Sequence, residues 1–203
     1  MYSKQKTKDV TLAALLTAFS LIITLFFPKI VIGPFSMTFA SHVPTMLEIF
    51  INPLVAFLTV IGSTIGFQIA LGPLVAIRAF THILFALLGY YLVKKRVNIF
   101  LVIILTSIAH AGAEALSVFF LTEALSPISL TPEKLNPYAG MLSDSLLSAP
   151  VKAFTLITFY GTLVQHYVDC VITAPVLTAL QKAKLVNSDF NFRFTRKSLA
   201  VSK

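Results

Sequence analysis

Arg78 lies within residues 74–93, a stretch of the chain that is long and apolar enough to cross a lipid bilayer. An arginine side chain keeps its proton in proteins, and placing its charge in hydrocarbon costs about 3 kcal/mol or more. The guanidinium therefore needs a polar cavity, an internal partner or a ligand. A small anion is the natural ligand, because a carboxylate can accept two parallel hydrogen bonds from a guanidinium.

Other polar side chains are expected at the same depth as Arg78. His82 follows it by four positions, so the two side chains share a helix face. His42 lies at the start of one apolar segment, and Glu114 lies near the end of another. Residues from three segments are thus predicted to line a buried site for a solute. A structural ion pair between Arg78 and either Glu114 or Glu48 is an alternative, and it is compatible with such a site.

The histidines also raise the question of a metal ion. The possible ligands are three histidines and one glutamate, namely His42, His82, His110 and Glu114. The chain has no HExxH sequence and no cysteine cluster, so we predict no metal site and no bound cofactor. The GxSxG and Walker A sequences are absent as well. We therefore expect no enzymatic activity, and any active transport would use ATP that partner subunits hydrolyse.

The composition is that of a membrane protein. Of the 203 residues, 57% are hydrophobic and only 12% are charged, and the mean hydropathy is +0.87. Soluble domains carry about 25% charged residues, so this chain lacks the polar surface to face water on all sides. The net charge of +8 could suggest a nucleic-acid partner, but no basic helix face interleaved with aromatic residues supports one. The expected surroundings are a lipid bilayer.

We predict an all-α bundle of six membrane-spanning helices, which forms a single transmembrane domain over residues 1–203. The expected spans are residues 10–27, 40–51, 54–71, 74–93, 99–121 and 151–180. Residues 122–150 are expected to form an external loop with a short helix around residues 138–147. The second span is the shortest, and losing it would reverse the direction of every later helix.

Basic residues predict which side of the membrane each end faces. Most of them fall on one side of the predicted topology: Lys4, Lys6, Lys8, Lys94, Lys95, Arg96, Lys182, Lys184, Arg193, Arg196, Lys197 and Lys203. Cytoplasmic segments carry an excess of lysine and arginine. Both termini are therefore expected in the cytoplasm, in a multi-pass protein of a bacterial plasma membrane.

Ala14 and Ala18 stand four positions apart in the first span. Small residues at this spacing let another helix approach closely, either within the bundle or from a partner protein. The chain resembles the substrate-binding S component of energy-coupling factor (ECF) vitamin transporters. The resemblance rests on this alanine pair together with the chain length, the six expected spans and Arg78. Residues 40–44, 62–67 and 78–86 are similar to the niacin and pantothenate branches of that family. The resemblance covers the first four spans, while the last two agree mainly in length and hydropathy.

The resemblance implies a mechanism. An S component binds a vitamin in a pocket open to the outside, capped by the loop after the first span and by other external loops. It then docks on a membrane scaffold subunit, to which two cytoplasmic ATPases are joined. In this sequence the docking positions would be Ala14 and Ala18. The capping residues would lie within residues 32–38 and around Asn136 and Tyr138.

Two carboxylate vitamins, pantothenate and niacin, would suit the arginine. Pantothenate needs further hydrogen-bonding partners, whereas niacin favours aromatic stacking, for which Phe35, Phe80 and Phe119 are candidates. We predict pantothenate, with niacin as the alternative, and a stand-alone carrier or an intramembrane enzyme as less favoured classes. The predicted substrate-binding residues are Arg78, His82, His42, Glu114, Thr38, Asn136 and Tyr160.

Overall fold

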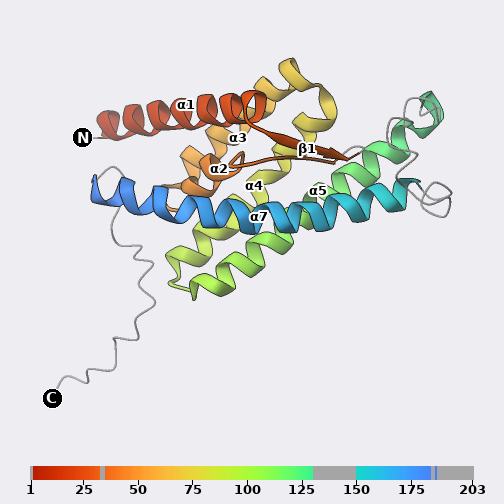
Figure 1. The fold of residues 1–203 in the computed structure, drawn as a ribbon. Coiled ribbons are helices and arrows are strands. Elements are labelled where there is room, and N and C mark those ends of the chain that lie inside the picture. Colours follow the sequence, from red (N-terminus) through yellow and green to blue (C-terminus); the bar gives the residue numbers. More distant parts are fainter. Residues whose placement is uncertain (1, 33–34, 130–149, 184–185, 187–203) are drawn as a thin grey trace.

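The computed structural model describes residues 2–32, 35–129, 150–183 and 186. These residues form a helical bundle with one two-stranded hairpin (Figure 1). The elements in chain order are α1 (Tyr2–Phe26), β1 (Lys29–Ile32), β2 (Phe35–Thr38), α2 (Val43–Glu48), α3 (Pro53–Leu71), α4 (Pro73–Lys94), α5 (Ile99–Ser129) and α7 (Pro150–Lys182).

Five of these helices are long and apolar enough to cross a membrane. The candidate spans are Lys6–Phe26, Pro53–Leu71, Pro73–Lys94, Ile99–Leu121 and Ala153–Lys182. Large apolar side chains point outward from them, as for Ile69 and Val171, which are 82% and 74% exposed. A water-soluble bundle would bury such side chains, whereas lipid solvates them. The prediction of a multi-pass helical membrane protein is confirmed.

The prediction of a second span over residues 40–51 is wrong. Only Val43–Glu48 is helical there, and the chain then turns before α3 begins. Two local features mark the interruption. Ala40 adopts a positive φ of 65° just before the helix, and the Asn52 side chain accepts a hydrogen bond from the Val55 amide, which starts a new helix.

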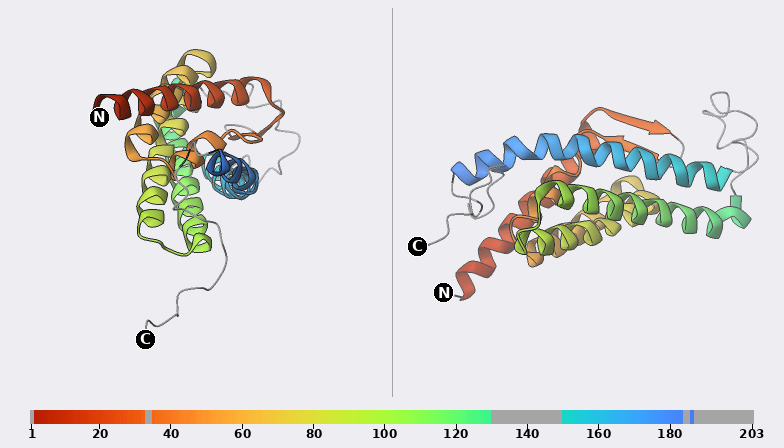
Figure 2. Two further views of the ribbon diagram at one scale, coloured as in Figure 1. Left: turned by 90° about the vertical axis from the view of Figure 1, so that its left-hand side faces the viewer. Right: turned by 90° about the horizontal axis from the view of Figure 1, so that it is seen from below.

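The missing span does not reverse the later helices. Helix α1 runs parallel to α3, because Thr59 bonds the Ala13 carbonyl while Gly66 lies against Leu21. The hairpin and α2 must therefore carry the chain back across the bundle between α1 and α3. As a result the start of α1 and the end of α7 at Lys182 lie at the same end of the molecule (Figures 1 and 2).

The predicted external loop over residues 122–150 is shorter than expected. Helix α5 continues to Ser129, and α7 begins at Pro150. Glu123, Ala124 and Leu125 are strong helix formers, which explains the extension. The short helix expected around residues 138–147 lies outside the described residues.

The region predicted to cap the site after the first span is the β-hairpin. Its strands are antiparallel, with Lys29 opposite Thr38 and Ile32 opposite Phe35. Phe35 is 4% exposed and packs over Gly161 of α7. A Cβ atom at Gly161 would collide with the Phe35 ring. The absence of a side chain at this glycine therefore lets the hairpin approach the helix.

Gly161→Ala is expected to push the hairpin away from α7 and to destabilise the fold by about 1–3 kcal/mol, as overpacking does. Gly112→Ala on α5 is the matched control, because a Cβ atom there would have nothing within 4 Å. An alanine at that control position should be neutral or stabilising, since alanine favours helix over glycine. Thermal unfolding of both variants in detergent tests the difference. Equal melting temperatures would contradict this packing.

Candidate functional site

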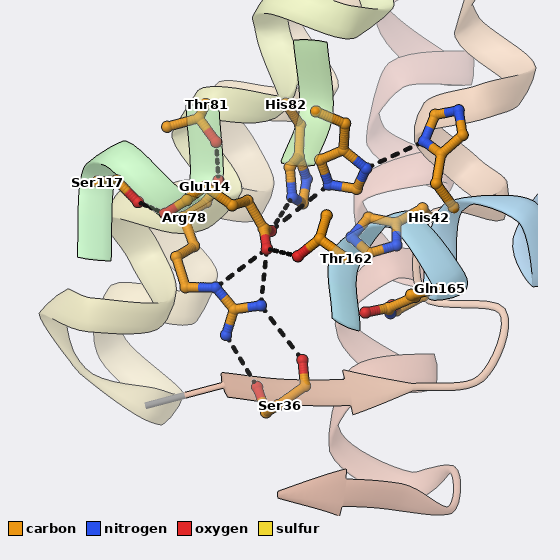
Figure 3. A network of polar contacts seen from close by, with 12 residues as sticks. Ser36, His42, Arg78, Thr81, His82, Glu114, Ser117, Thr162 and Gln165 are labelled. Carbon is orange, nitrogen blue, oxygen red and sulfur yellow. Dashed lines mark hydrogen bonds and ion pairs between the residues drawn. The ribbon is translucent and has the colours of Figure 1, made fainter. Parts of the chain in front are cut away.

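Arg78 of α4 is buried between α5 and the hairpin, with 5% of its surface exposed. Its Nε and Nη2 atoms donate to Oε2 of Glu114 at 3.2 and 2.8 Å. On the other side, Nη1 donates to Ser36 Oγ and Nη2 donates to the Ser36 carbonyl, both at 3.2 Å (Figure 3). The guanidinium thus bridges a helix of the bundle and the strand that covers it.

Glu114 is the centre of the polar network. Its Oε2 atom also accepts a hydrogen bond from Thr162 Oγ1 of α7 at 2.7 Å. Its other oxygen, Oε1, lies 3.0 Å from His82 Nε2 and 3.5 Å from His110 Nε2. The carboxylate is 1% exposed. Of the two partners considered from the sequence, Arg78 therefore pairs with Glu114, whereas Glu48 is buried elsewhere, beside the apolar core around α2.

His42 is held in place by Asp169 of α7. The His42 Nδ1 atom lies 2.9 Å from Asp169 Oδ2, and the same carboxylate accepts hydrogen bonds from the backbone amides of Ala40 and His42 at 2.8 and 3.2 Å. Asp169 therefore anchors the turn between the hairpin and α2. It presents the His42 ring to the rings of His82 and His110, whose centroids lie 4.7 and 4.5 Å away.

A cavity lies between the hairpin and these helices. It contains about 400 Å³ of space not filled by atoms, including open solvent at its mouth. Its lining residues are Ser20, Thr24, Ser36, Thr38, Ser41, His42, Phe67, Val75, Arg78, Ala79, His82, Glu114 and Gln165. Small polar side chains with one arginine suit a small, charged solute.

The structure brings five of the predicted binding residues together around this cavity: Arg78, His82, His42, Glu114 and Thr38. Tyr160 does not line it. That side chain is 62% exposed on the outer face of α7, where its ring packs against Phe159. Helix periodicity turns Tyr160 away because Thr162 and Gln165 of the same helix face inward. Asn136 lies outside the described residues.

The aromatic residues considered for niacin are placed differently from one another. Phe35 lies under Arg78, with its ring centroid 5.6 Å from the guanidinium carbon. Phe80 is 49% exposed on the outside of α4. Phe119 packs against Phe120 instead of lining the cavity. Phe67 of α3 does line it, and its sequence context carried no signal that distinguished it from other apolar residues of the span.

Several lining residues were missed from the sequence. Ser20 and Thr24 stand four apart on α1, and this polar pair in an apolar span was a usable signal. Gln165 donates from Nε2 to the Thr38 carbonyl at 3.1 Å and to Ser41 Oγ at 2.9 Å. It therefore ties α7 to the hairpin at the edge of the cavity.

Ala14 and Ala18 lie on the exposed face of α1, whereas Ala13 and Leu16 face the bundle and are 3% and 7% exposed. The alanine pair is therefore not used for packing among the described helices. It remains available to a helix of another protein.

Comparison with known proteins found one informative similarity. The chain is 36% identical over 125 residues to the niacin transporter NiaX of Lactococcus lactis subsp. cremoris (strain MG1363). The match covers 57% of this chain and 56% of that protein, so the chain spans little more than half the length of this relative. No family model and no solved structure matches the chain.

Proposed function

We propose that this chain is the substrate-binding subunit of an ECF-type vitamin importer and that its vitamin is niacin. The observation that carries the proposal is the buried Arg78, held by Glu114 at the wall of a small cavity. Niacin is a small aromatic carboxylate, and a fixed guanidinium binds a carboxylate strongly where water is excluded. Similarity to a niacin transporter supports the same choice.

Niacin replaces pantothenate as the favoured vitamin for two reasons. The relative is a niacin transporter, and Tyr160, one of the predicted substrate-binding residues, does not line the cavity. Its side chain is 62% exposed on the outer face of α7. The cavity that remains is small and offers aromatic surface at Phe67 and at the imidazole rings of His42 and His82. A flat heteroaromatic acid suits these walls better than a flexible chain of amide and hydroxyl groups.

The proposed pose uses the contacts that Arg78 makes with the hairpin. Ser36 accepts hydrogen bonds from both terminal nitrogens of the guanidinium, whereas Glu114 accepts from Nε and Nη2. A vitamin carboxylate would replace Ser36 and leave the Glu114 pair in place. Glu114 then orients the arginine instead of blocking it, so the ion pair and the binding site are parts of one arrangement.

Uptake would depend on partner subunits, namely a membrane scaffold and two cytoplasmic ATPases. The exposed Ala14 and Ala18 support docking of α1 on such a scaffold. The basic groups at Lys8, Lys94 and Lys182 support a cytoplasmic location for the end of the bundle that holds the start of α1 and the end of α7. The cavity lies toward the opposite end and would open to the outside.

A binding titration of the purified protein tests the choice of vitamin. Niacin is expected to bind at least ~100-fold more tightly than nicotinamide, because the amide has the same ring but no charge to pair with the guanidinium; a charge-assisted hydrogen bond contributes roughly 1.5–3 kcal/mol. Pantothenate is expected to bind no more tightly than nicotinamide. Isothermal titration calorimetry with the three compounds measures this order. Tighter binding of pantothenate than of niacin would refute the assignment.

A further inference from the structure

Three histidines and one glutamate converge at the inner wall of the cavity. One ligand atom from each of His42, His82, His110 and Glu114 lies within 4.8 Å of the others. We propose that these four residues bind a divalent first-row transition metal ion, with Zn²⁺ as the best-fitting probe. The metal site stands on its own contacts and does not depend on which vitamin the cavity takes.

The hydrogen bonds of His166 determine which nitrogen of His110 is free. Thr106 Oγ1 lies 2.8 Å from the Val102 carbonyl and 3.1 Å from His166 Nε2. We assign its proton to the shorter contact, so that Thr106 accepts from His166 Nε2. The other nitrogen of His166, Nδ1, is then an acceptor and receives the Nδ1 proton of His110 at 3.0 Å. With the protons assigned in this way, a neutral His110 ring carries its lone pair on Nε2.

That lone pair has no hydrogen-bond donor among the described residues. His110 is 0% exposed, and its Nε2 atom makes no hydrogen bond there. It lies 3.5 Å from Glu114 Oε1 instead, so two electron-rich atoms face each other inside the bundle. A buried acceptor without a donor is costly. A cation between the two atoms turns this repulsion into two ligand bonds.

Hydrogen bonds to neighbouring residues also determine which atom of the other three side chains faces the proposed ion. Asp169 accepts the Nδ1 proton of His42 and leaves Nε2 of that ring as the ligand atom, which is the carboxylate–histidine arrangement common around zinc. Arg78 and Thr162 engage Oε2 of Glu114, so Oε1 is the ligand oxygen. His82 points Nε2 at that same oxygen, 3.0 Å away, and becomes a ligand when its proton moves to Nδ1.

The distances suit a tetrahedral ion. Metal–nitrogen bonds of about 2.0–2.1 Å place neighbouring ligand atoms roughly 3.3 Å apart. Glu114 Oε1 lies 3.0 Å from His82 Nε2 and 3.5 Å from His110 Nε2, and all four ligand atoms lie within 4.8 Å of one another. Ligand atoms that lie farther apart than about 3.3 Å would move toward each other when the ion binds. Three imidazoles and a carboxylate favour zinc, and they also accept cobalt or nickel.

The charge around the cavity gives the metal a role. With neutral imidazoles, the site holds the positive Arg78 and two carboxylates, Glu114 and Asp169, so negative charge is in excess. A carboxylate that enters this low-dielectric region is attracted by Arg78 and repelled by the two carboxylates. A divalent cation would make the net charge of the site positive and so strengthen its attraction for a carboxylate. The prediction of no metal rested on missing sequence motifs, whereas these ligands come from separate elements of the fold.

The test is metal binding by the full chain in detergent, with any polyhistidine tag removed and bound metal stripped by a chelator. Calorimetry with Zn²⁺ alone, in the absence of vitamin, is expected to show one ion per chain. Co²⁺ is expected to give the visible spectrum of a four-coordinate ion. His82→Gln retains a hydrogen-bond donor to Glu114 but removes the ligand nitrogen, and it should weaken Zn²⁺ binding at least ~100-fold.

Ser107→Ala is the matched control. Ser107 lies on α5 and is as fully buried as His110, but it bonds Ile104 and Tyr167 outside the cluster. It should bind Zn²⁺ as the unaltered chain does. His110→Gln should also lose binding, and His82→Gln alone decides the matter if His110→Gln does not fold. Absence of stoichiometric Zn²⁺ binding, or binding that survives His82→Gln, overturns the proposal. Zn²⁺ binding without niacin binding would refute the vitamin assignment and leave the metal site standing.

Discussion

Arg78→Ala is expected to weaken niacin binding at least ~100-fold. The guanidinium offers two adjacent donors, and each hydrogen bond to a charged acceptor contributes roughly 1.5–3 kcal/mol. Alanine removes both bonds and the only positive side chain among the residues that line the described cavity. Calorimetry or intrinsic fluorescence with the purified chain measures the change. Unchanged affinity would make Arg78 purely structural.

Loss of folding could be mistaken for loss of binding in this variant. Removing Arg78 leaves the buried Glu114 carboxylate uncompensated, and breaking such a pair costs about 3–5 kcal/mol. The double substitution Arg78→Met with Glu114→Gln removes both charges and should melt near the temperature of the unaltered protein. It should still fail to bind niacin. Arg78→Lys is the matched test of geometry, because it keeps the charge but loses the planar arrangement of donors. Its affinity for niacin should lie between that of the unaltered protein and that of Arg78→Ala.

Ala14→Trp and Ala18→Trp are expected to abolish ATP-driven niacin uptake while leaving niacin binding unchanged. Both alanines lie on the exposed face of α1. A large side chain there would prevent the close helix approach that small residues allow. Neither alanine lines the cavity. The measurement is uptake into vesicles that contain the complete transporter, with binding to the isolated chain measured in parallel.

Val171→Trp provides the control for added bulk on the lipid-facing surface, because Val171 is 74% exposed on α7. Uptake by this variant should match that of the unaltered protein. If Ala14→Trp and Ala18→Trp also transport normally, α1 is not the docking helix. If they lose binding together with uptake, the substitutions disturb the fold and the docking assignment fails.

The sequence was sufficient to predict that Arg78, His82 and Glu114 lie close together. Arg78 and His82 are four residues apart on one helix, and Glu114 lies on the next helix, which runs in the opposite direction. Consecutive helices that run in opposite directions place such positions at the same depth. This can be predicted without knowing how the side chains pack. The high cost of a charge in lipid then requires that they meet.

The hairpin and α2 could not be predicted, because their positions depend on distant parts of the chain. Residues 40–51 are apolar enough to suggest a span, and only the contacts of Asp169 with Ala40 and His42 show why the chain turns there. Those contacts join residues more than a hundred positions apart. The bond between His110 and His166 also joins two distant helices, across 56 positions of the chain. Periodicity shows which face of a helix is polar, but it does not identify the partner on another element.

Ser36 accepts the hydrogen bonds from Arg78 that the carboxylate of the proposed ligand would accept. The chain's own serine sits on the guanidinium nitrogens that a carboxylate would use, so ligand and hairpin compete for them. Apparent affinity then equals the intrinsic affinity reduced by the fraction of molecules whose hairpin has moved aside; a fraction of about one in a hundred weakens it ~100-fold. Substitutions that loosen the hairpin would thus tighten binding without touching the ligand. The contact between Ser36 and Arg78 would then influence both the affinity for the solute and how often the solute can enter the cavity.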